Sequence, residues 1–223
     1  MEPSRDAFNS ILKLDLPSNR PFNLMINAGA TEVVSLLAPR FTFNEMLEYT
    51  RRLCLDNSIS LDTEAYCSEA CTGNRNRAIG YLLASKDMLH GDVLSCVDMY
   101  FQLCSLSVTA RSLAGMSLVL SADGVDPKMG ERLLDKRVVR TMKTLMFICD
   151  MYDESGEYAC RVGIPSKVVW VRRYYGLCRR MYGHWMLWPA LDTRGNSIGG
   201  IYTMERLSDT LKLHVFDADN DIR

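Results

Sequence analysis

The sequence predicts an α/β fold of the α+β sandwich kind, with a helical part packed against one antiparallel sheet. Three observations lead to this prediction. Apolar residues recur at helical spacing through the first three-quarters of the chain, and short β-branched and aromatic runs follow Met151. A closing amphipathic segment, from about Thr203 to Phe216, predicts a last helix. Helices, then strands, then a closing helix fit layers built around a single sheet.

The helices are predicted from periodicity and from their first residues. Asn27 is expected to cap a helix that runs to Leu37. Thr42 and Glu45 have the spacing of a capping box, which predicts a helix from there to about Cys54. Further helices are expected at 74–85, 92–104, 107–121 and 135–148.

The strands are predicted from three runs rich in β-branched and aromatic residues. These runs are Tyr158–Ile164, Val168–Cys178 and His184–Trp188, and the 192–196 segment reads as a turn. Short connections between the runs favour antiparallel pairing. We therefore expect one sheet made from the last third of the chain.

Length and composition indicate an ordinary globular protein. With 223 residues, 48% of them hydrophobic and 24% charged, the chain suits a single domain over 1–223, and no linker-like tract divides it. A formal net charge of −1 gives no global reason to expect nucleic acid as a partner. No apolar run approaches the roughly 18 residues of a membrane span, so no membrane partner is expected.

Eight cysteines are scattered along the chain, mostly within apolar helical patterns. Cys67 and Cys71 lie four residues apart, as in half of a metal site, but no second Cys/His pair accompanies them. We predict buried, unpaired thiols, no metal site, and a reducing compartment.

A spaced series of five motifs carries the functional information. In chain order they are R-P-F-N-L-M-I-N-A-G-A from Arg20, S-E-A-C-T-G-N-R-N-R-A-I-G from Ser68, D-M-Y-F-Q-L-C-S from Asp98, M-Y-D-E-S-G-E-Y from Met151 and G-I-P-S-K from Gly163. This series resembles the serine-dependent glutaminases, from E-P-S at Glu2 to about the last helix. The resemblance implies the fold of the serine β-lactamases and penicillin-binding proteins. It also implies a homo-oligomer (dimer or tetramer) and, as its activity, the hydrolysis of L-glutamine to L-glutamate and ammonia through an acyl-serine intermediate. We expect no cofactor.

The same resemblance implies which residues line the substrate site. Glutamine is a zwitterion, so its ammonium needs a carboxylate and its carboxylate needs hydrogen-bond donors. Glu69 offers the first, and the amides of Asn27 and Asn76 offer the second. Glu69 and Asn76 are seven residues apart, two helical turns if that stretch is continuous. Tyr100 and Tyr152 add hydroxyls, and Tyr152 takes the proton-relay role nearest the chemistry.

Each of these residues also has a structural interpretation when it is taken alone. Asn27 fits a helix cap, Glu69 a solvated helix residue, and Tyr100 a core aromatic. Tyr152 fits an ordinary packed tyrosine. The order and spacing of the motif series, rather than any single residue, favour the functional interpretation.

The first departure from the family pattern concerns the nucleophile. The family uses a serine in an S-x-x-K motif, where the lysine assists serine deprotonation, and the resemblance places that motif upstream of Glu2. The S-x-x-K at Ser10–Lys13 falls after that position, so we interpret it as a chance match. We expect an N-terminally truncated member of the family, poorly soluble and without glutaminase activity.

The second departure is the atypical segment 168–187. After G-I-P-S-K the family continues with a glycine-rich strand that supplies an oxyanion-hole amide. Here the matching positions hold Val168, Val169, Trp170, Val171, Arg172 and Arg173. The resemblance implies that Trp170 stands at the place of the oxyanion-hole residue, where its backbone N–H is expected to be retained. The family pattern resumes at Pro189 with no change in length, and a pair of compensating frame shifts is one hypothesis for this segment.

Other functions fit the sequence less well. A non-catalytic glutaminase-like protein, which binds a ligand or modulates an oligomer, is the main alternative. A β-lactamase or penicillin-binding protein is disfavoured because no S-D-N or K-T-G triplet occurs. Arginine and aromatic residues near Trp170 resemble a single-strand nucleic-acid surface, but one stretch is a weak basis for it. An intracellular location is expected, cytoplasmic or, with a transit peptide, mitochondrial.

Overall fold

The computed structural model describes residues 24–149, 155–169, 173–177, 183–187, 192 and 197–217. The chain divides into two compact units, each with its own internal packing. Unit 1 comprises Met1–Arg51 and Asn57–Val108, and unit 2 comprises Arg52–Asp56 and Thr109–Arg223. The single domain expected over 1–223 stays a prediction.

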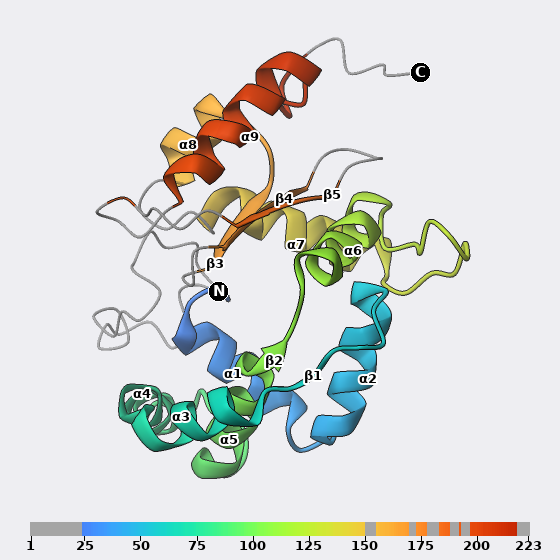
Figure 1. Ribbon diagram of the computed structural model, residues 1–223. Helices are drawn as coiled ribbons and strands as arrows, with labels where there is room; N and C mark the ends of the chain where they lie inside the picture. Colours follow the sequence, from blue (N-terminus) through green and yellow to red (C-terminus); the bar gives the residue numbers. More distant parts are fainter. Residues whose placement is uncertain are drawn as a thin grey trace. The chain divides into compact units, whose positions relative to one another are not determined.

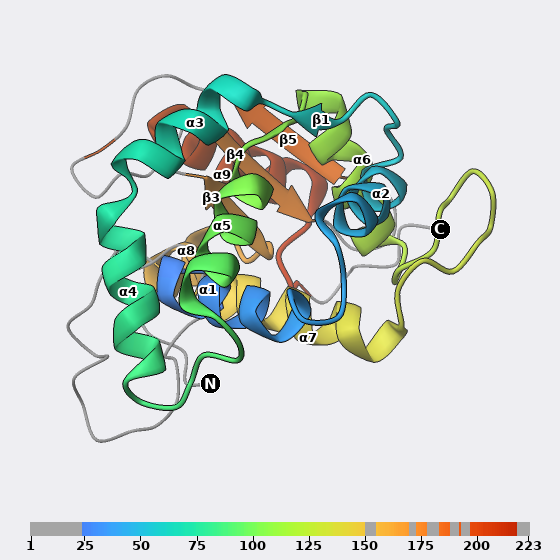
Figure 2. The same ribbon diagram turned by 90° about the horizontal axis from the view of Figure 1, so that it is seen from below.

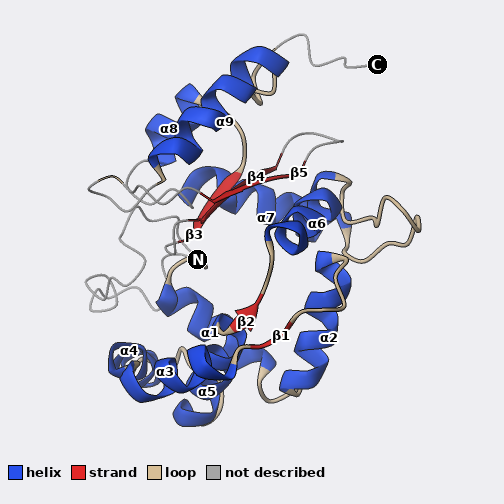
Figure 3. Cartoon of the chain, viewed as in Figure 1, coloured by secondary structure: helices blue, strands red, loops and turns tan. Residues whose placement is uncertain are grey.

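Unit 1 is almost entirely helical in the residues described (Figures 1 and 3). Its two short strands, β1 (Ser60–Leu61) and β2 (Leu106–Ser107), pair antiparallel. The helices are α1 (Asn27–Leu37), α2 (Phe43–Cys54, which continues into unit 2 at Arg52), α3 (Thr63–Thr72), α4 (Asn74–Ala84) and α5 (Val93–Cys104). Helices α1, α4 and α5 agree with the sequence-based ranges to within a residue or two, and α3 was not predicted as a separate helix.

Helix α5 is the centre of unit 1, since α1, α3 and α4 all pack against it (Figure 2). The apolar cluster at these contacts consists of Val34, Val97, Tyr100 and Phe101. Partly buried residues such as Tyr66 and Ala70 of α3 pack around it. Burial of this cluster is the main stabilising term in the unit, because short helices in water are marginal without tertiary packing.

Polar residues at the helix starts explain where several helices begin. Asp62 accepts a hydrogen bond from the Ala65 amide at 3.0 Å at the start of α3. The capping box of α2 is confirmed: Glu45 accepts from the Thr42 amide at 2.7 Å, and Thr42 Oγ1 accepts from the Glu45 amide at 3.3 Å. The cap predicted at Asn27 is wrong. Ile26 occupies the N-cap position, and Asn27 is the first helical residue.

Unit 2 contains a three-stranded antiparallel sheet in the order β3-β4-β5. Its strands are β3 (Ser166–Val169), β4 (Arg173–Leu177) and β5 (Gly183–Leu187), with Lys167 opposite Tyr175 and Tyr175 opposite Trp185. Its helices are α6 (Ala110–Ser121), α7 (Lys136–Cys149), α8 (Ser155–Arg161) and α9 (Ile198–Leu211). Figure 1 shows α8 and α9 on one side of this sheet and α6 and α7 on the other. The predicted α/β sandwich is confirmed.

Two of the predicted strands are wrong. The run Tyr158–Ile164 is helix α8 as far as Arg161, because Tyr158 and Val162 lie four residues apart and are buried together beside Met204. The run predicted as one strand, Val168–Cys178, instead contributes to two paired strands, β3 and β4. In the run Tyr158–Ile164, β-branched and aromatic residues marked burial rather than an extended backbone.

The closing helix begins earlier than predicted, at Ile198 rather than about Thr203. Ser197 caps it by accepting a hydrogen bond from the Gly200 amide at 3.1 Å. The helix ends at Leu211 because Lys212 adopts a left-handed conformation with φ of 53°. In the described part of the chain, every helix is too short or too polar to cross a bilayer.

The cysteines with described side chains are all unpaired, as predicted, but only some are buried. Cys54, Cys96 and Cys149 are buried, whereas Cys67, Cys71, Cys104 and Cys160 are exposed. The expected burial of Cys67 and Cys71 is therefore wrong. Helix α3 turns Tyr66 and Ala70 toward the core, which places the two cysteines on another face.

Candidate functional site

The structure joins two of the predicted site residues directly. Nδ2 of Asn27, at the start of α1, donates a hydrogen bond to Oδ1 of Asn76 in α4 at 2.9 Å. The two residues are 49 positions apart in sequence, and both are half-buried. One hydrogen bond uses only part of what two side-chain amides offer, so both retain donors and acceptors for a ligand.

Glu69 presents an exposed carboxylate from α3. The stretch from Glu69 to Asn76 is not one continuous helix. The predicted spacing of two helical turns between these residues required a continuous helix, so it does not apply. Helix α3 ends at Thr72 and α4 begins at Asn74, with Gly73 between them. Figure 2 shows the two helices diverging where α3 ends.

Gly73 is required by close packing at this break. A Cβ at this position would lie 2.7 Å from Cε1 of Phe101 and 2.5 Å from the Glu69 carbonyl oxygen. The Gly73 amide also donates to that carbonyl at 2.8 Å. Arg77 braces the same junction: it donates to the Ala70 carbonyl, and its guanidinium lies 5.3 Å from the centroid of the Phe101 ring. The break therefore has a fixed geometry, which sets where α3 and α4 place their polar side chains.

Tyr100 belongs to the apolar cluster of α5 and is only 8% exposed. Its ring packs at a tilt against Phe101, with centroids 6.2 Å apart. Its side chain also hydrogen-bonds the thiol of Cys104, one helical turn further along. The structural interpretation as a core aromatic thus holds for the ring of Tyr100, while the polar end takes part in a hydrogen bond.

Cys104 is a neighbour that the sequence reasoning missed. Although Cys104 is exposed as a residue, the protein atoms around its thiol keep water from it, and this desolvation raises the pKa to about 11. The hydrogen bond from Tyr100 opposes this rise and the charge of Glu69 reinforces it. The thiol therefore lies within electrostatic reach of two predicted site residues, Glu69 and Tyr100. Its spacing of four residues from Tyr100 on a predicted helix was the available signal.

Four predicted site residues thus come from four helices of unit 1, namely α1, α3, α4 and α5. Tyr152, Trp170, Ser10 and Lys13 lie outside the described residues, and their roles stay predictions. Within the described residues, no cluster of three or more His, Cys, Asp and Glu side chains is placed to hold a metal ion.

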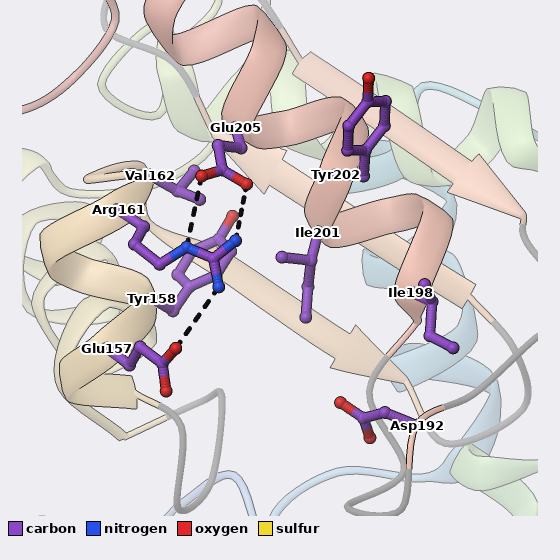
Figure 4. Close-up of a pocket in the computed structure, with 9 residues that line it drawn as sticks. All are labelled: Glu157, Tyr158, Arg161, Val162, Asp192, Ile198, Ile201, Tyr202 and Glu205. Carbon is purple, nitrogen blue, oxygen red and sulfur yellow. Dashed lines mark hydrogen bonds and ion pairs between the residues drawn. The ribbon is translucent and has the colours of Figure 1, made fainter.

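Unit 2 contains a cavity of about 300 Å³ that includes none of the predicted site residues (Figure 4). Helices α8 and α9 and the residue Asp192 line it. Arg161 at its edge donates to Glu205 through Nη2 at 2.7 Å and Nε at 3.3 Å, and to Glu157 through Nη1 at 3.4 Å. The guanidinium is bonded to both glutamates, and its bonds to Glu205 cross from α8 to α9, so we interpret the group as a structural link between these helices.

Comparison with known proteins decides the family. The sequence matches the family described as Glutaminase over residues 1–216. The chain belongs to the glutaminase family. A glutaminase of Clostridium botulinum (strain Loch Maree, type A3) is 41% identical over 220 residues, which cover 97% of this chain and 72% of that protein.

Solved glutaminase structures share the fold. The probable glutaminase of Bacillus subtilis superposes with a TM-score of 0.88 at 32% identity, over 96% of this chain and 73% of that chain. The protein Mglu, in a structure described as its glutamate form, superposes with a TM-score of 0.87 at 32% identity. That match covers 98% of this chain and 51% of the other. The glutaminase fold, β-lactamase-like as the resemblance implied, is confirmed.

Proposed function

We propose that four residues of unit 1 bind L-glutamine, namely Asn27, Glu69, Asn76 and Tyr100. We also propose that the protein takes part in the hydrolysis of L-glutamine by water to L-glutamate and ammonia. The observation that carries this proposal is the hydrogen bond between Asn27 and Asn76. It joins residues of two separate motifs through side chains that suit an amino-acid ligand. A relative whose structure is described as its glutamate form supports the same ligand class.

Each of these side chains is assigned to one group of the ligand. The Glu69 carboxylate pairs with the α-ammonium, and the amides of Asn27 and Asn76 donate to the α-carboxylate. The Tyr100 hydroxyl adds a further polar contact. By the family resemblance, Tyr152 takes the proton-relay role and the backbone N–H of Trp170 the role of oxyanion donor toward the side-chain amide of glutamine.

The chemical step requires a serine activated by a lysine. The serine oxygen attacks the amide carbon, ammonia leaves with a proton delivered through Tyr152, and water then hydrolyses the acyl ester to give L-glutamate. By the family pattern this serine precedes Glu2, and Ser10–Lys13 does not supply it. We therefore propose that hydrolysis requires this serine and its lysine in addition to the glutamine-binding residues of unit 1, and that the protein assembles as a homo-oligomer.

Binding is tested by titration calorimetry of the 223-residue chain with L-glutamine and L-glutamate. Glu69→Gln is expected to raise the Kd about tenfold or more, since it removes the charge that pairs with the ammonium. Glu64→Gln is the matched control, because Glu64 is an exposed glutamate on the same helix. Equal Kd values for the two variants would contradict the assignment of Glu69.

Catalysis is tested by ammonia release from L-glutamine. We expect none from the pure chain. Ammonia release that a Ser10→Ala change abolishes would overturn the interpretation of Ser10 as a chance match.

Light scattering on the purified chain tests the proposed homo-oligomer. A monomer at micromolar concentration would contradict it.

A non-catalytic binding or oligomer-modulating protein is the second candidate. The observation that favours it is β3, where Val168 and Val169 form regular pairs with Tyr174 and Arg173. The family has glycines at these positions to let the backbone approach the substrate. A polypeptide that supplies the upstream serine and lysine distinguishes the two candidates: hydrolysis supports the enzyme, and glutamine binding without hydrolysis supports the second candidate.

A further inference from the structure

The contact between α3 and α5 contains a carboxylate that the proposed binding roles do not use. Asp98, in α5, accepts a hydrogen bond from the Tyr66 hydroxyl of α3 through Oδ1 at 2.6 Å. Its second oxygen, Oδ2, accepts from the Gln102 side-chain amide at 2.8 Å. Both oxygens of this partly buried carboxylate are therefore engaged, and one of the two bonds crosses between helices.

The bond from Tyr66 is charge-assisted. The pKa of Tyr66 is raised, chiefly by this hydrogen bond, then by loss of solvent and by the charge of Asp98. The phenol therefore remains protonated and donates to the Asp98 carboxylate. Bonds of this kind are roughly twice as strong as those between neutral groups.

Helix α3 depends on such a bond more than its neighbours do. All ten of its residues are described, and none is fully buried, whereas α5 buries Cys96, Val97, Tyr100 and Phe101. Tyr66 and Ala70 reach the apolar cluster only as partly buried residues. A short helix with so little buried surface is easily displaced unless a polar contact fixes it.

The position of this bond links it to the site. On α3, Tyr66 precedes Glu69 by three residues, so the two lie on adjoining turns. On α5, Asp98 precedes Tyr100 by two residues, about half a turn, so the bond fixes the helix that carries Tyr100 rather than the Tyr100 side chain itself. Helices α3 and α5 pack against each other, and Tyr66 and Ala70 of α3 contact the apolar cluster that contains Tyr100.

We propose that Asp98 is a positioning residue, which holds Tyr66 and thereby keeps Glu69 of α3 beside Tyr100 of α5 for the ammonium group of the substrate. This inference rests on the proposed binding of glutamine. Asp98 touches no substrate in this scheme. Its contribution is to spare the ligand the cost of ordering α3 when it binds.

The test uses three variants of the 223-residue chain and two measurements. Tyr66→Phe removes the donor, Asp98→Ala removes the acceptor, and the double variant tests whether they act as one unit. Asp92→Ala is the matched control, because Asp92 caps the start of the same helix α5 through the Ser95 amide at 2.8 Å and does not bond α3. The measurements are the Kd for L-glutamine and hydrogen exchange of the backbone amides of residues 64–72.

We expect Tyr66→Phe and Asp98→Ala each to raise the Kd about tenfold, with the double variant no weaker than Asp98→Ala alone. Exchange should accelerate within α3 for these variants only. The control should lower thermal stability while leaving the Kd within about twofold. Unchanged affinity in Tyr66→Phe and Asp98→Ala overturns the proposal, as does an equal loss of affinity in the control.

The two proposals fail in different ways. If the unaltered chain binds no glutamine, the proposed function fails, and exchange in the ligand-free protein still decides the role of Asp98. Faster exchange confined to α3 then supports Asp98 as the anchor of that helix. Unchanged exchange overturns that role too.

Discussion

The polar clusters of unit 1 and unit 2 differ in how far their groups satisfy one another. In unit 2, Arg161 donates to Glu205 and Glu157, so its charge is matched beside the cavity of about 300 Å³. In unit 1, Asn27 and Asn76 share one hydrogen bond and keep further capacity. A cavity lined with paired charges is thus weaker evidence for a ligand site than two side-chain amides that still have hydrogen-bond donors and acceptors available.

The two clusters also differ in how the chain builds them. The unit 2 group joins α8 to α9 through the ion pair of Arg161 with Glu205, while the pair of Arg161 with Glu157 lies within α8. Both pairs are solvent-accessible, and such pairs contribute little in water. The unit 1 site residues depend on the break between α3 and α4 at Gly73, where a side chain would clash with the Phe101 ring and the Glu69 carbonyl. Changes in unit 1 are therefore expected to affect both stability and binding, and changes in unit 2 to affect stability alone.

The largest effect is expected from Gly73→Ala. The new methyl group would contact the Phe101 ring and the Glu69 carbonyl, which should lower the free energy of unfolding by about 3 kcal/mol and weaken glutamine binding. Urea denaturation measures the first effect. Gly130→Ala is the control, since a Cβ there meets nothing within 4 Å and only its φ of +70° costs energy, about 1 kcal/mol. Equal losses in both variants would contradict the close packing at Gly73.

The next effect concerns the reactivity of Cys104. Because its pKa is raised to about 11, its thiolate fraction at pH 8 is roughly two orders of magnitude below that of an ordinary thiol. Cys71 and Cys104 are both exposed, so the raised pKa is the basis of the comparison: alkylation of Cys104 by iodoacetamide should lag behind that of Cys71 and accelerate with pH up to about 11. Mass spectrometry of the peptides gives both rates. Bound glutamine should slow Cys104 further, and a rate indifferent to glutamine would place the ligand elsewhere.

Asn76→Ala should weaken glutamine binding about tenfold, equivalent to about 1.4 kcal/mol, because it removes one amide and the partner of Asn27. Calorimetry measures this change. Asn74→Ala is the control, since Asn74 lies at the start of the same helix and is exposed. If the Asn74 variant loses as much affinity, the effect belongs to α4 as a whole and not to the Asn76 side chain.

The smallest effect is expected from Arg161→Met in unit 2. Loss of its exposed ion pairs should lower the free energy of unfolding by about 0.5–1 kcal/mol and leave the Kd for glutamine unchanged. Arg52→Met, which removes a single exposed pair with Glu131, provides the comparison for stability. A change in glutamine affinity in Arg161→Met would mean that the unit 2 cavity takes part in binding.

Local signals in the sequence were sufficient for much of unit 1. The capping box of Thr42 and Glu45 and the apolar periodicity of α4 and α5 depend on residues three or four apart, so they can be read directly. The same reasoning failed at Tyr158–Ile164. There β-branched and aromatic residues are buried by α9, and burial suits a helix as well as a strand. The site residues Asn27, Glu69, Asn76 and Tyr100 were named from the motif series, while Cys104 and Asp98 were not assigned roles.

The sequence by itself determined the family, the alternation of helices and sheet, and which polar residues are candidates for binding. Motif order and short-range periodicity are properties of the chain alone. Only the tertiary structure decided that Asn27 bonds Asn76 rather than caps its helix, and that the chain breaks at Gly73. The physical reason is that these features depend on contacts between residues far apart in the sequence, 49 positions in the case of the two asparagines. Such contacts form when α1, α4 and α5 bury their shared apolar surface.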